Sequence, residues 1–161
     1  MSLNMVELMD RVAALETEAL AALSPSVSAN AVDRFFHTQA AYPYFVNRLG
    51  AISIDADSED FDVYTVNVQM RLLIGHITEG YEGEVENRLQ LYIPQVITYF
   101  NEHEELQSAT YTAALVDLDR ARVVACTGFA VFQQSGISTS LVGAEFTLQC
   151  QLTEQITQAI Y

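Results

Sequence analysis

Along residues 64–76, YTVNVQMRLLIGH, apolar and polar side chains alternate with a period of two. This alternation predicts a β-strand with two unlike faces, because successive side chains of a strand point to opposite sides. One face carries Tyr64, Val66, Val68, Met70 and Leu72. The other carries Thr65, Asn67, Gln69 and Arg71. The second face is polar but nearly uncharged, which raises the question of what such a surface contacts.

Residues 3–23 show helical periodicity and predict an amphipathic helix. The apolar positions are Met5, Val6, Met9, Val12, Leu15, Leu20 and Leu23. The charged residues Glu7, Asp10, Arg11 and Glu18 fall elsewhere on the helix. Asn4 is expected to cap the helix, and the segment 24–26, Ser-Pro-Ser, is expected to end it.

A second, longer helix is expected over residues 84–106. Its apolar positions are Val85, Leu89, Tyr92, Ile93, Val96 and Phe100. Pro94 lies inside this pattern and removes the hydrogen bond to the carbonyl of Gln90. The helix is therefore expected either to kink at Pro94 or to split into two.

Three further strands are expected, at 44–54, 123–133 and 142–152. The segment 123–133 is apolar on both faces, which favours a central position in the sheet. Pairing the last two strands about position 138 places Cys126 opposite Cys150, Gly128 opposite Leu148 and Ala130 opposite Phe146. The predicted fold is α+β: an N-terminal helix, an antiparallel sheet of four to five strands with a long helix on one face, and a C-terminal hairpin. One domain over residues 1–161 is expected, and residues 24–43 are left unassigned.

The composition limits the partners that the surface can accept. The chain has 161 residues, and 21 acidic against 7 basic residues give a net charge of −14; every basic residue is an arginine. Such a surface repels nucleic-acid phosphate and anionic membranes, although it is compatible with a pore through which DNA slides. No apolar run reaches the roughly 18 residues that a transmembrane helix needs.

Candidate chemistry is sparse. The acidic segment 55–62 contains Asp55, Asp57, Glu59, Asp60 and Asp62. A calcium-binding loop needs Gly at its sixth position and Glu at its twelfth, and this segment has neither. We therefore expect a solvated loop rather than a weak cation site. His37, His76 and His103 have no second ligand at metal-binding spacing, and His103 suits a helix end. No catalytic, cofactor-binding or metal-binding residue is predicted.

The cysteines and arginines each leave two interpretations open. Cys126 and Cys150 are expected to be reduced core residues, with a cross-strand disulfide as the alternative. The four arginines considered are expected to pair with nearby acids, with interface ion pairs as the alternative. They are Arg71, Arg88, Arg120 and Arg122.

The polar strand positions suit a subunit interface or a wet lumen better than bulk solvent, which usually attracts Lys and Glu. On the strand at 64–76 they are Thr65, Asn67 and Gln69. On the strand at 142–152 they are Thr147, Gln149 and Gln151. We therefore expect these side chains to face other copies of the chain or a channel.

The order of these elements resembles the tail terminator, or tail-completion, proteins in the neck of long-tailed bacteriophages. The resemblance covers residues 3–153 and is carried by AYPYFVNRLGAISID, DVYTVNVQMRLLIG, GEVENRLQLYIPQVITYFNE and the hairpin from VVACTGFAVF to AEFTLQCQL. It implies a virion protein assembled in the host cytoplasm as a ring, usually of six copies. Such a ring caps the tail tube and meets the head–tail connector protein, and DNA passes through its lumen. No enzymatic activity and no cofactor are implied.

The residues expected at the interfaces come from exposure and not from a family motif. They are Asp55, Asp57, Glu59, Asp60, Asp62, Asn67, Gln69, Arg71, Ser135, Ser138, Thr139, Ser140, Thr147, Gln149 and Gln151. Two other classes stay open. One is a pocket protein of the nuclear-transport-factor-2-like kind, and the other is a head–tail stopper or adaptor.

Overall fold

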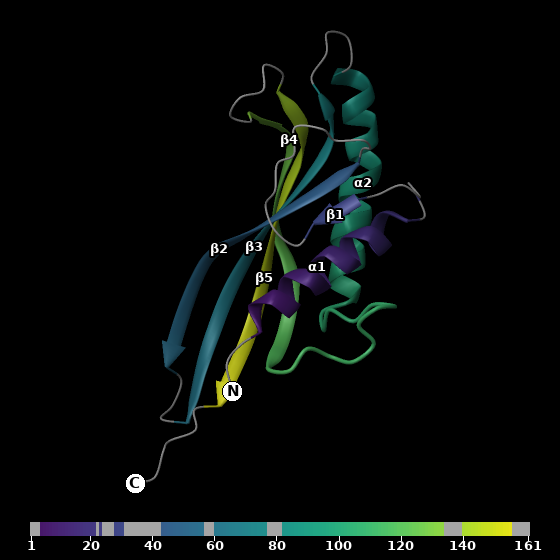
Figure 1. Cartoon of the computed structure of the whole chain (residues 1–161). Helices are drawn as coiled ribbons and strands as arrows, with labels where there is room; N and C mark the ends of the chain where they lie inside the picture. The colour runs from purple at the N-terminus through teal and green to yellow at the C-terminus, as the bar shows by residue number, and fades with distance from the viewer. Residues whose placement is uncertain are drawn as a thin grey trace.

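A single twisted sheet with both helices on one side forms the molecule (Figure 1). The computed structural model describes residues 4–21, 23, 28–30, 43–56, 60–76, 82–133 and 140–155. The elements in chain order are α1 (Met5–Leu20), β1 (Ser28–Asn30), β2 (Tyr44–Ala56), β3 (Phe61–His76), α2 (Glu82–Glu102), β4 (Leu118–Phe132) and β5 (Leu141–Gln155). The fold is α+β with a C-terminal hairpin, as predicted.

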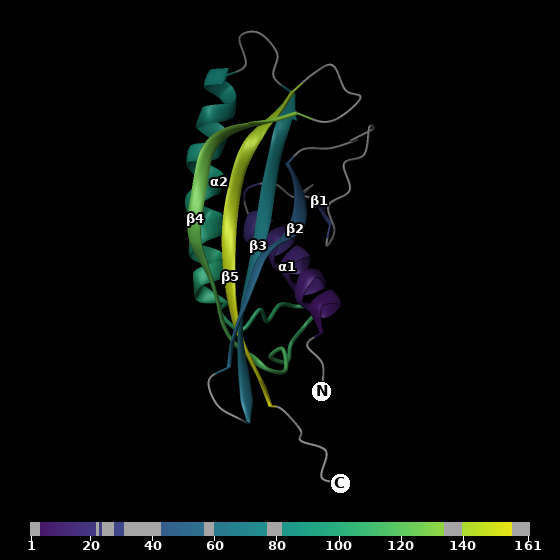
Figure 2. The same ribbon diagram turned by 90° about the vertical axis from the view of Figure 1, so that its left-hand side faces the viewer.

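The strand order is β1-β2-β3-β5-β4. The last four strands are antiparallel, and the short β1 pairs in parallel with Tyr44–Val46 of β2. Figure 2 looks onto the face of the sheet that the helices leave uncovered, with α1 and α2 behind it. We call this the open face.

Helix α1 begins where the sequence predicts, because the Asn4 side chain accepts a hydrogen bond from the backbone N–H of Glu7 at 3.0 Å. Its buried side differs from the prediction. Val6 is 73 % exposed and Leu23 is 43 % exposed, whereas Arg11 and Glu16 are buried. The buried residues are Leu8, Met9, Arg11, Val12, Leu15, Glu16, Ala19 and Leu20. Val6 and Leu8 lie about 200° apart around a helix, so burying Leu8 exposes Val6.

Helix α2 is one continuous helix with Pro94 inside it, so it does not split. It ends at Glu102 rather than at residue 106. The ring of His103 then stacks on Tyr99 at 4.2 Å between centroids, and His103 Nδ1 lies 2.7 Å from the Tyr99 carbonyl oxygen. His103 therefore closes the end of the helix, where a cationic or donor group is favoured.

The alternation in β3 is confirmed. Val66, Val68, Met70 and Leu72 are fully buried under the helices, together with Ala144, Phe146, Leu148, Cys150 and Leu152 of β5. Thr65, Asn67, Gln69 and Arg71 lie on the open face and are half-buried.

Strand β4 is the edge strand of the sheet and not a central one, so that prediction is wrong. Most of its residues are exposed, including Val124 at 55 % and Val131 at 50 %. The predicted hairpin register is also wrong, since Cys126 pairs with Phe146 and Cys150 pairs with Ala121. The register shifts at three places along the strand, and extra residues of this kind are common in bulged edge strands.

Because of this register, the two cysteines do not face each other and differ in exposure. Cys126 is exposed, while Cys150 is buried and its burial raises the pKa of its thiol to about 12. Partial burial also raises the pKa of the Cys126 thiol, but that side chain is exposed to a reagent. We expect a thiol reagent such as Ellman's reagent to modify one cysteine per native chain, Cys126, and the second only in denaturant, because reaction needs an accessible thiolate. Mild oxidation should give no disulfide within the chain. Two reactive thiols in the native protein would contradict this arrangement.

The predicted acidic loop at 55–62 is shorter in the structure, because its two ends belong to strands. Asp55 belongs to β2 and Asp62 to β3, and Asp60 lies just before β3. Asp57 and Glu59 lie outside the described residues, as do Ser135, Ser138 and Thr139 of the expected hairpin tip. Ser140 directly precedes β5 and is half-buried.

Candidate interaction surface

The polar residues of β3 and β5 form directly opposed pairs across the open face. Thr65 lies opposite Gln151, Asn67 opposite Gln149, and Gln69 opposite Thr147. We call these six residues the amide strip. The Thr147 hydroxyl donates to Gln69 Oε1 at 3.1 Å. Side chains directly opposite each other in an antiparallel pair are close enough to interact, so the strip is a continuous hydrogen-bonding surface without charge.

One polar atom of the strip is left without a bond. Asn67 Oδ1 is buried and has no hydrogen-bond partner among the described residues. A buried acceptor in this condition costs free energy until a donor reaches it. This acceptor is enclosed within the chain and is not part of the accessible surface of the strip.

Charged side chains border the strip. Arg71 Nε lies 2.7 Å from Glu145 Oε2 on the neighbouring strand, and its guanidinium lies over the Phe132 ring at 5.1 Å. Toward β4, the strip borders a hollow of about 290 Å³. Its lining includes Arg120, Arg122 and Val124 of β4 and Gln149 and Gln151 of the strip.

The predicted pairing of arginines with acids is confirmed for three of the four. Besides the Arg71 pair, Arg88 pairs with Glu84 at 2.9 Å and Arg122 pairs with Glu104 at 3.2 Å. Arg120 forms no ion pair within the described part of the chain. The exposed pairs are worth little stability, because solvent screens them.

An apolar groove lies between β4 and α2, on the helix-covered face of the sheet. It has a volume of about 340 Å³, and we call it the α2–β4 groove. Its lining residues are Glu86, Leu89, Gln90, Ile93, Pro94, Gly128 and Phe129. No histidine or cysteine joins its one carboxylate, so the groove offers a surface for binding and not a catalytic pair.

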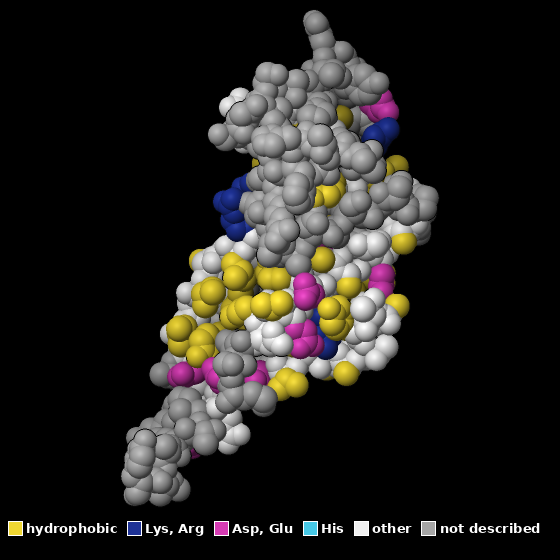
Figure 3. Space-filling model, viewed as in Figure 1, with side chains coloured by type: hydrophobic (Ala, Val, Ile, Leu, Met, Phe, Trp, Pro, Cys, Tyr) yellow, Lys and Arg dark blue, Asp and Glu magenta, His cyan; other side chains and the backbone are white. Residues whose placement is uncertain are grey.

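Strand β2 carries exposed apolar side chains on the same side of the sheet as the helices. Leu49, Ile52 and Ile54 are 39 %, 46 % and 61 % exposed, and we call them the β2 row. Their partners on β3 are Val68, Val66 and Tyr64, which belong to the face toward the core. Figure 3 shows hydrophobic side chains gathered over this part of β2. Sequence periodicity placed this strand but did not show that its apolar side extends beyond α1.

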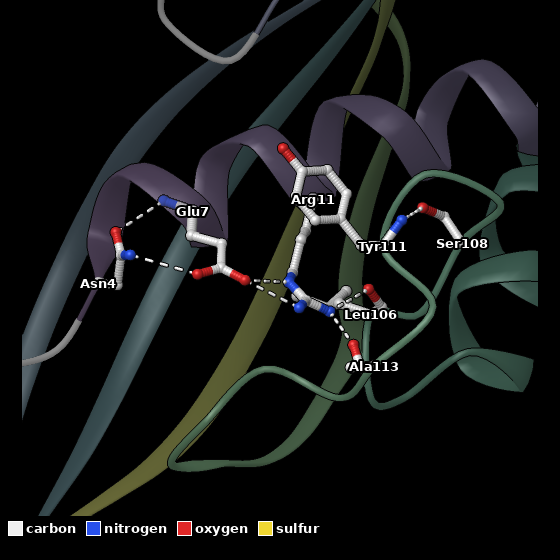
Figure 4. A network of polar contacts seen from close by, with 7 residues as sticks. All are labelled: Asn4, Glu7, Arg11, Leu106, Ser108, Tyr111 and Ala113. Atoms are coloured by element: carbon white, nitrogen blue, oxygen red, sulfur yellow. Dashed lines mark hydrogen bonds and ion pairs between the residues drawn. The ribbon is translucent and has the colours of Figure 1, made fainter.

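A buried arginine fastens α1 to the segment between α2 and β4 (Figure 4). Arg11 Nη1 donates to the carbonyl oxygens of Leu106 at 3.2 Å and Ala113 at 2.6 Å. Its Nε and Nη2 donate to Glu7 Oε1, and the guanidinium lies 5.0 Å from the centroid of the Tyr111 ring. This network is structural, because the side chain is only 4 % exposed.

A second buried ionisable group joins α1 to the sheet. Glu16 is fully buried, and its Oε1 accepts a hydrogen bond from Asn47 Nδ2 of β2. Its Oε2 has no hydrogen-bond partner among the described residues. Burial raises the pKa of Glu16 well above its ordinary value, against the opposite effect of the Asn47 bond. The folded state therefore favours the protonated, uncharged carboxyl.

Glu16→Gln should be more stable than the natural chain, and this difference in the free energy of unfolding should grow as the pH rises. A raised folded-state pKa means that the folded chain binds the proton more tightly, so the contribution of Glu16 is complete below about pH 4.5 and is lost as the pH rises through the folded-state pKa. Gln is uncharged at every pH and keeps a side-chain oxygen that can accept the hydrogen bond from Asn47. We expect the variant to gain about 1 to 3 kcal/mol over the natural chain at pH 8, and less at pH 4.5.

Urea unfolding followed by circular dichroism at the two pH values measures this difference. Glu105→Gln is the control, because it makes the same substitution at an exposed carboxyl outside the buried side of α1. A Glu16→Gln variant that is less stable than the natural chain at both pH values would contradict the assignment of a neutral carboxyl.

Among the described residues, no group of three or more His, Cys, Asp or Glu side chains is placed to hold a metal ion. No described helix is long and apolar enough to cross a membrane. No protein-family model matches the chain, and a search of the curated proteins finds no match.

Proposed function

We propose that this chain is a structural protein that assembles with copies of itself into a ring, and that it acts as a tail terminator at the neck of a long-tailed bacteriophage. In this role it caps the tail tube, meets the head–tail connector protein and catalyses no reaction. The amide strip is the observation that carries the proposal. The element order of the chain, which resembles that family, supports the particular role.

The amide strip favours a protein contact or a channel wall over bulk solvent. The chain carries 28 charged residues, yet the centre of its open face has six uncharged hydrogen-bonding side chains on two adjacent strands. Charged residues are depleted from the centres of protein interfaces, because their desolvation is costly. The strip has that composition.

The overall charge fits a ring through which DNA moves. With a net charge of −14 per copy and no lysine, a ring presents strong negative potential to the phosphate backbone. Repulsion of this kind prevents DNA from adhering to the wall while it passes. The same charge makes copies repel each other, so the contacts between them must be supplied by uncharged surfaces.

Light scattering on the purified chain, combined with negative-stain microscopy, tests the proposal. We expect a discrete multiple of 17.9 kDa and ring-shaped particles. Raising the salt from about 0.05 M to about 0.5 M should favour assembly, because it shortens the range of repulsion between the acidic copies. A single chain at every concentration and salt, with no rings or tubes, would contradict the proposal.

A further inference from the structure

We infer that the α2–β4 groove of one copy receives the β2 row of a second copy of this chain. The inference rests on the self-assembly proposed above and names the two surfaces that meet. It uses contacts on the helix-covered side of the sheet, which the amide strip does not involve.

The groove is shaped to take apolar side chains and one donor. Leu89 forms part of its floor at 3 % exposure, and Ile93 and Phe129 contribute apolar walls. Gln90 and Pro94 both line it. Because proline has no N–H, the Gln90 carbonyl lacks the hydrogen bond that residue 94 would otherwise donate in a helix. Gln90 adds polar atoms to a mainly apolar lining, so the groove suits a partner that carries both apolar side chains and a donor.

The β2 row supplies that combination. Leu49, Ile52 and Ile54 point to the helix side of the sheet and extend beyond the cover of α1, and the backbone between them carries N–H donors. Of the described residues, only Ser28–Asn30 pairs with the outer side of β2, and it does so at Tyr44–Val46. An approaching subunit can therefore reach the row from the side of the sheet.

The position of each surface favours a contact between copies. The groove and the row lie at opposite edges of the sheet and on the same side of it, so one copy cannot bring its own row into its own groove. Residues 49–54 and 123–133 contain no charged residue, although the chain as a whole has a net charge of −14, and Glu86 of α2 is the one charged residue that lines the groove. Exposed edges usually carry charges that prevent pairing, and these two segments lack them.

The lower part of β4 is already covered and is not the docking site. The Ala121 N–H donates to the Glu104 carbonyl at 2.8 Å, and the Val123 N–H donates to Asn101 Oδ1 at 3.0 Å. The end of α2 and the turn after it thus occupy that stretch of the edge. Further along β4, Gly128 and Phe129 line the groove, and Phe129 and Val131 are both more than 40 % exposed.

A contact between two different surfaces of the same chain is heterologous. Repetition of such a contact closes into a ring when the rotation between neighbours fits, and otherwise gives an open filament. Each copy then uses its groove on one side and its row on the other. The inference therefore accounts for assembly beyond a dimer with a single kind of interface.

Two variants block one surface each. Gly128→Leu places a side chain in the groove, and it should leave the fold intact because a Cβ at this position meets nothing within 4 Å. Ile54→Glu places a charge in the β2 row at a site that is 61 % exposed. We expect each variant alone to lose the ring and to run as a single chain. Their equimolar mixture should form a one-to-one pair of twice 17.9 kDa, since one variant keeps its row and the other its groove.

The matched control is Val116→Glu, which changes a residue that is 64 % exposed and belongs to neither surface, and it should assemble like the natural chain. Circular dichroism confirms that all three variants are folded. Ring formation by Gly128→Leu and Ile54→Glu, or a mixture that yields no pair, would overturn the inference while the proposed function stands. A natural chain that stays monomeric overturns both.

Cross-linking gives a second test that does not depend on loss of assembly. Cys126 is exposed on β4, two residues from Gly128, and Cys150 is buried. In Ile52→Cys, a short bismaleimide should join Cys126 of one copy to residue 52 of the next, and a denaturing gel should show a ladder that ends at the number of copies in the ring. Adding Cys126→Ser should abolish the ladder. A ladder that persists in this double variant would also overturn the inference.

Discussion

Replacing Gly143 by alanine should unfold the protein at a much lower urea concentration, with a loss of about 3 kcal/mol or more, at the upper end of the cost of overpacking. A Cβ at this position would lie 1.7 Å from the Leu72 carbonyl oxygen and 2.8 Å from the Leu72 carbonyl carbon. Both atoms belong to the backbone of β3, so no side chain can rotate away to make room.

The local register explains why the two backbones come so close. Leu73 pairs with Gly143, but the next pair is Gly75 with Val142, so one extra residue enters β3 at this point. Such a bulge bends its strand and disrupts the ladder locally, and here the Leu72 carbonyl occupies the place that a Cβ at position 143 would take. Glycine at 143 therefore allows β3 and β5 to stay paired through the bulge.

Gly128→Ala on the other strand of the same hairpin is the control, because a Cβ there meets nothing within 4 Å. We expect it to change stability by no more than about 0.5 kcal/mol. Urea unfolding of both variants, followed by circular dichroism, measures the difference. Equal midpoints for Gly143→Ala and the natural chain would show that β3 and β5 do not approach as described.

The second large effect is expected for Arg11→Met, which should lower the free energy of unfolding by about 2 to 4 kcal/mol. Methionine keeps much of the apolar stem but leaves the carbonyls of Leu106 and Ala113 without the donors that Arg11 supplies. Glu7 is about one-third exposed and can be solvated, so the larger part of the cost comes from the two carbonyls.

Arg88→Met provides the comparison. Arg88 and Glu84 form an ion pair one helical turn apart, and both side chains are about half exposed, so the variant should lose no more than about 0.5 kcal/mol. Limited proteolysis adds a local readout, because the segment at 103–117 should be cut faster in Arg11→Met than in Arg88→Met. Equal unfolding midpoints and equal cutting would contradict a fastening role for Arg11.

The parts of the fold that depend on local periodicity could be predicted from the sequence. The two faces of β3 and β5, the Asn4 cap and the extent of the second helix to within a few residues are all local properties. The position of β4 could not be predicted in the same way. Its apolar composition is typical of a central strand, and whether a strand is central depends on which strands are available to pair with it.

The candidate surface was only partly accessible to sequence reasoning. The amides of the strip were identified on each strand, but their direct opposition depends on the register between β3 and β5. Glu16 could have been noticed, because it lies four residues after Val12 and next to Leu15 within the buried side of α1. The α2–β4 groove joins residues of α2 with residues of β4 that are far apart in the chain, and no local pattern connects Pro94 with Gly128, 34 positions later.

The strict division of β3 and β5 into two faces also separates the residues of the open face from those that form the core. Even-numbered residues of β3 from Val66 to Leu72 contribute to the core, while odd-numbered residues from Thr65 to Arg71 reach outward. Substitutions at the odd positions leave the packing of the core in place. The sheet is therefore a platform whose specificity can diverge between related chains, or be redesigned, while its architecture is retained.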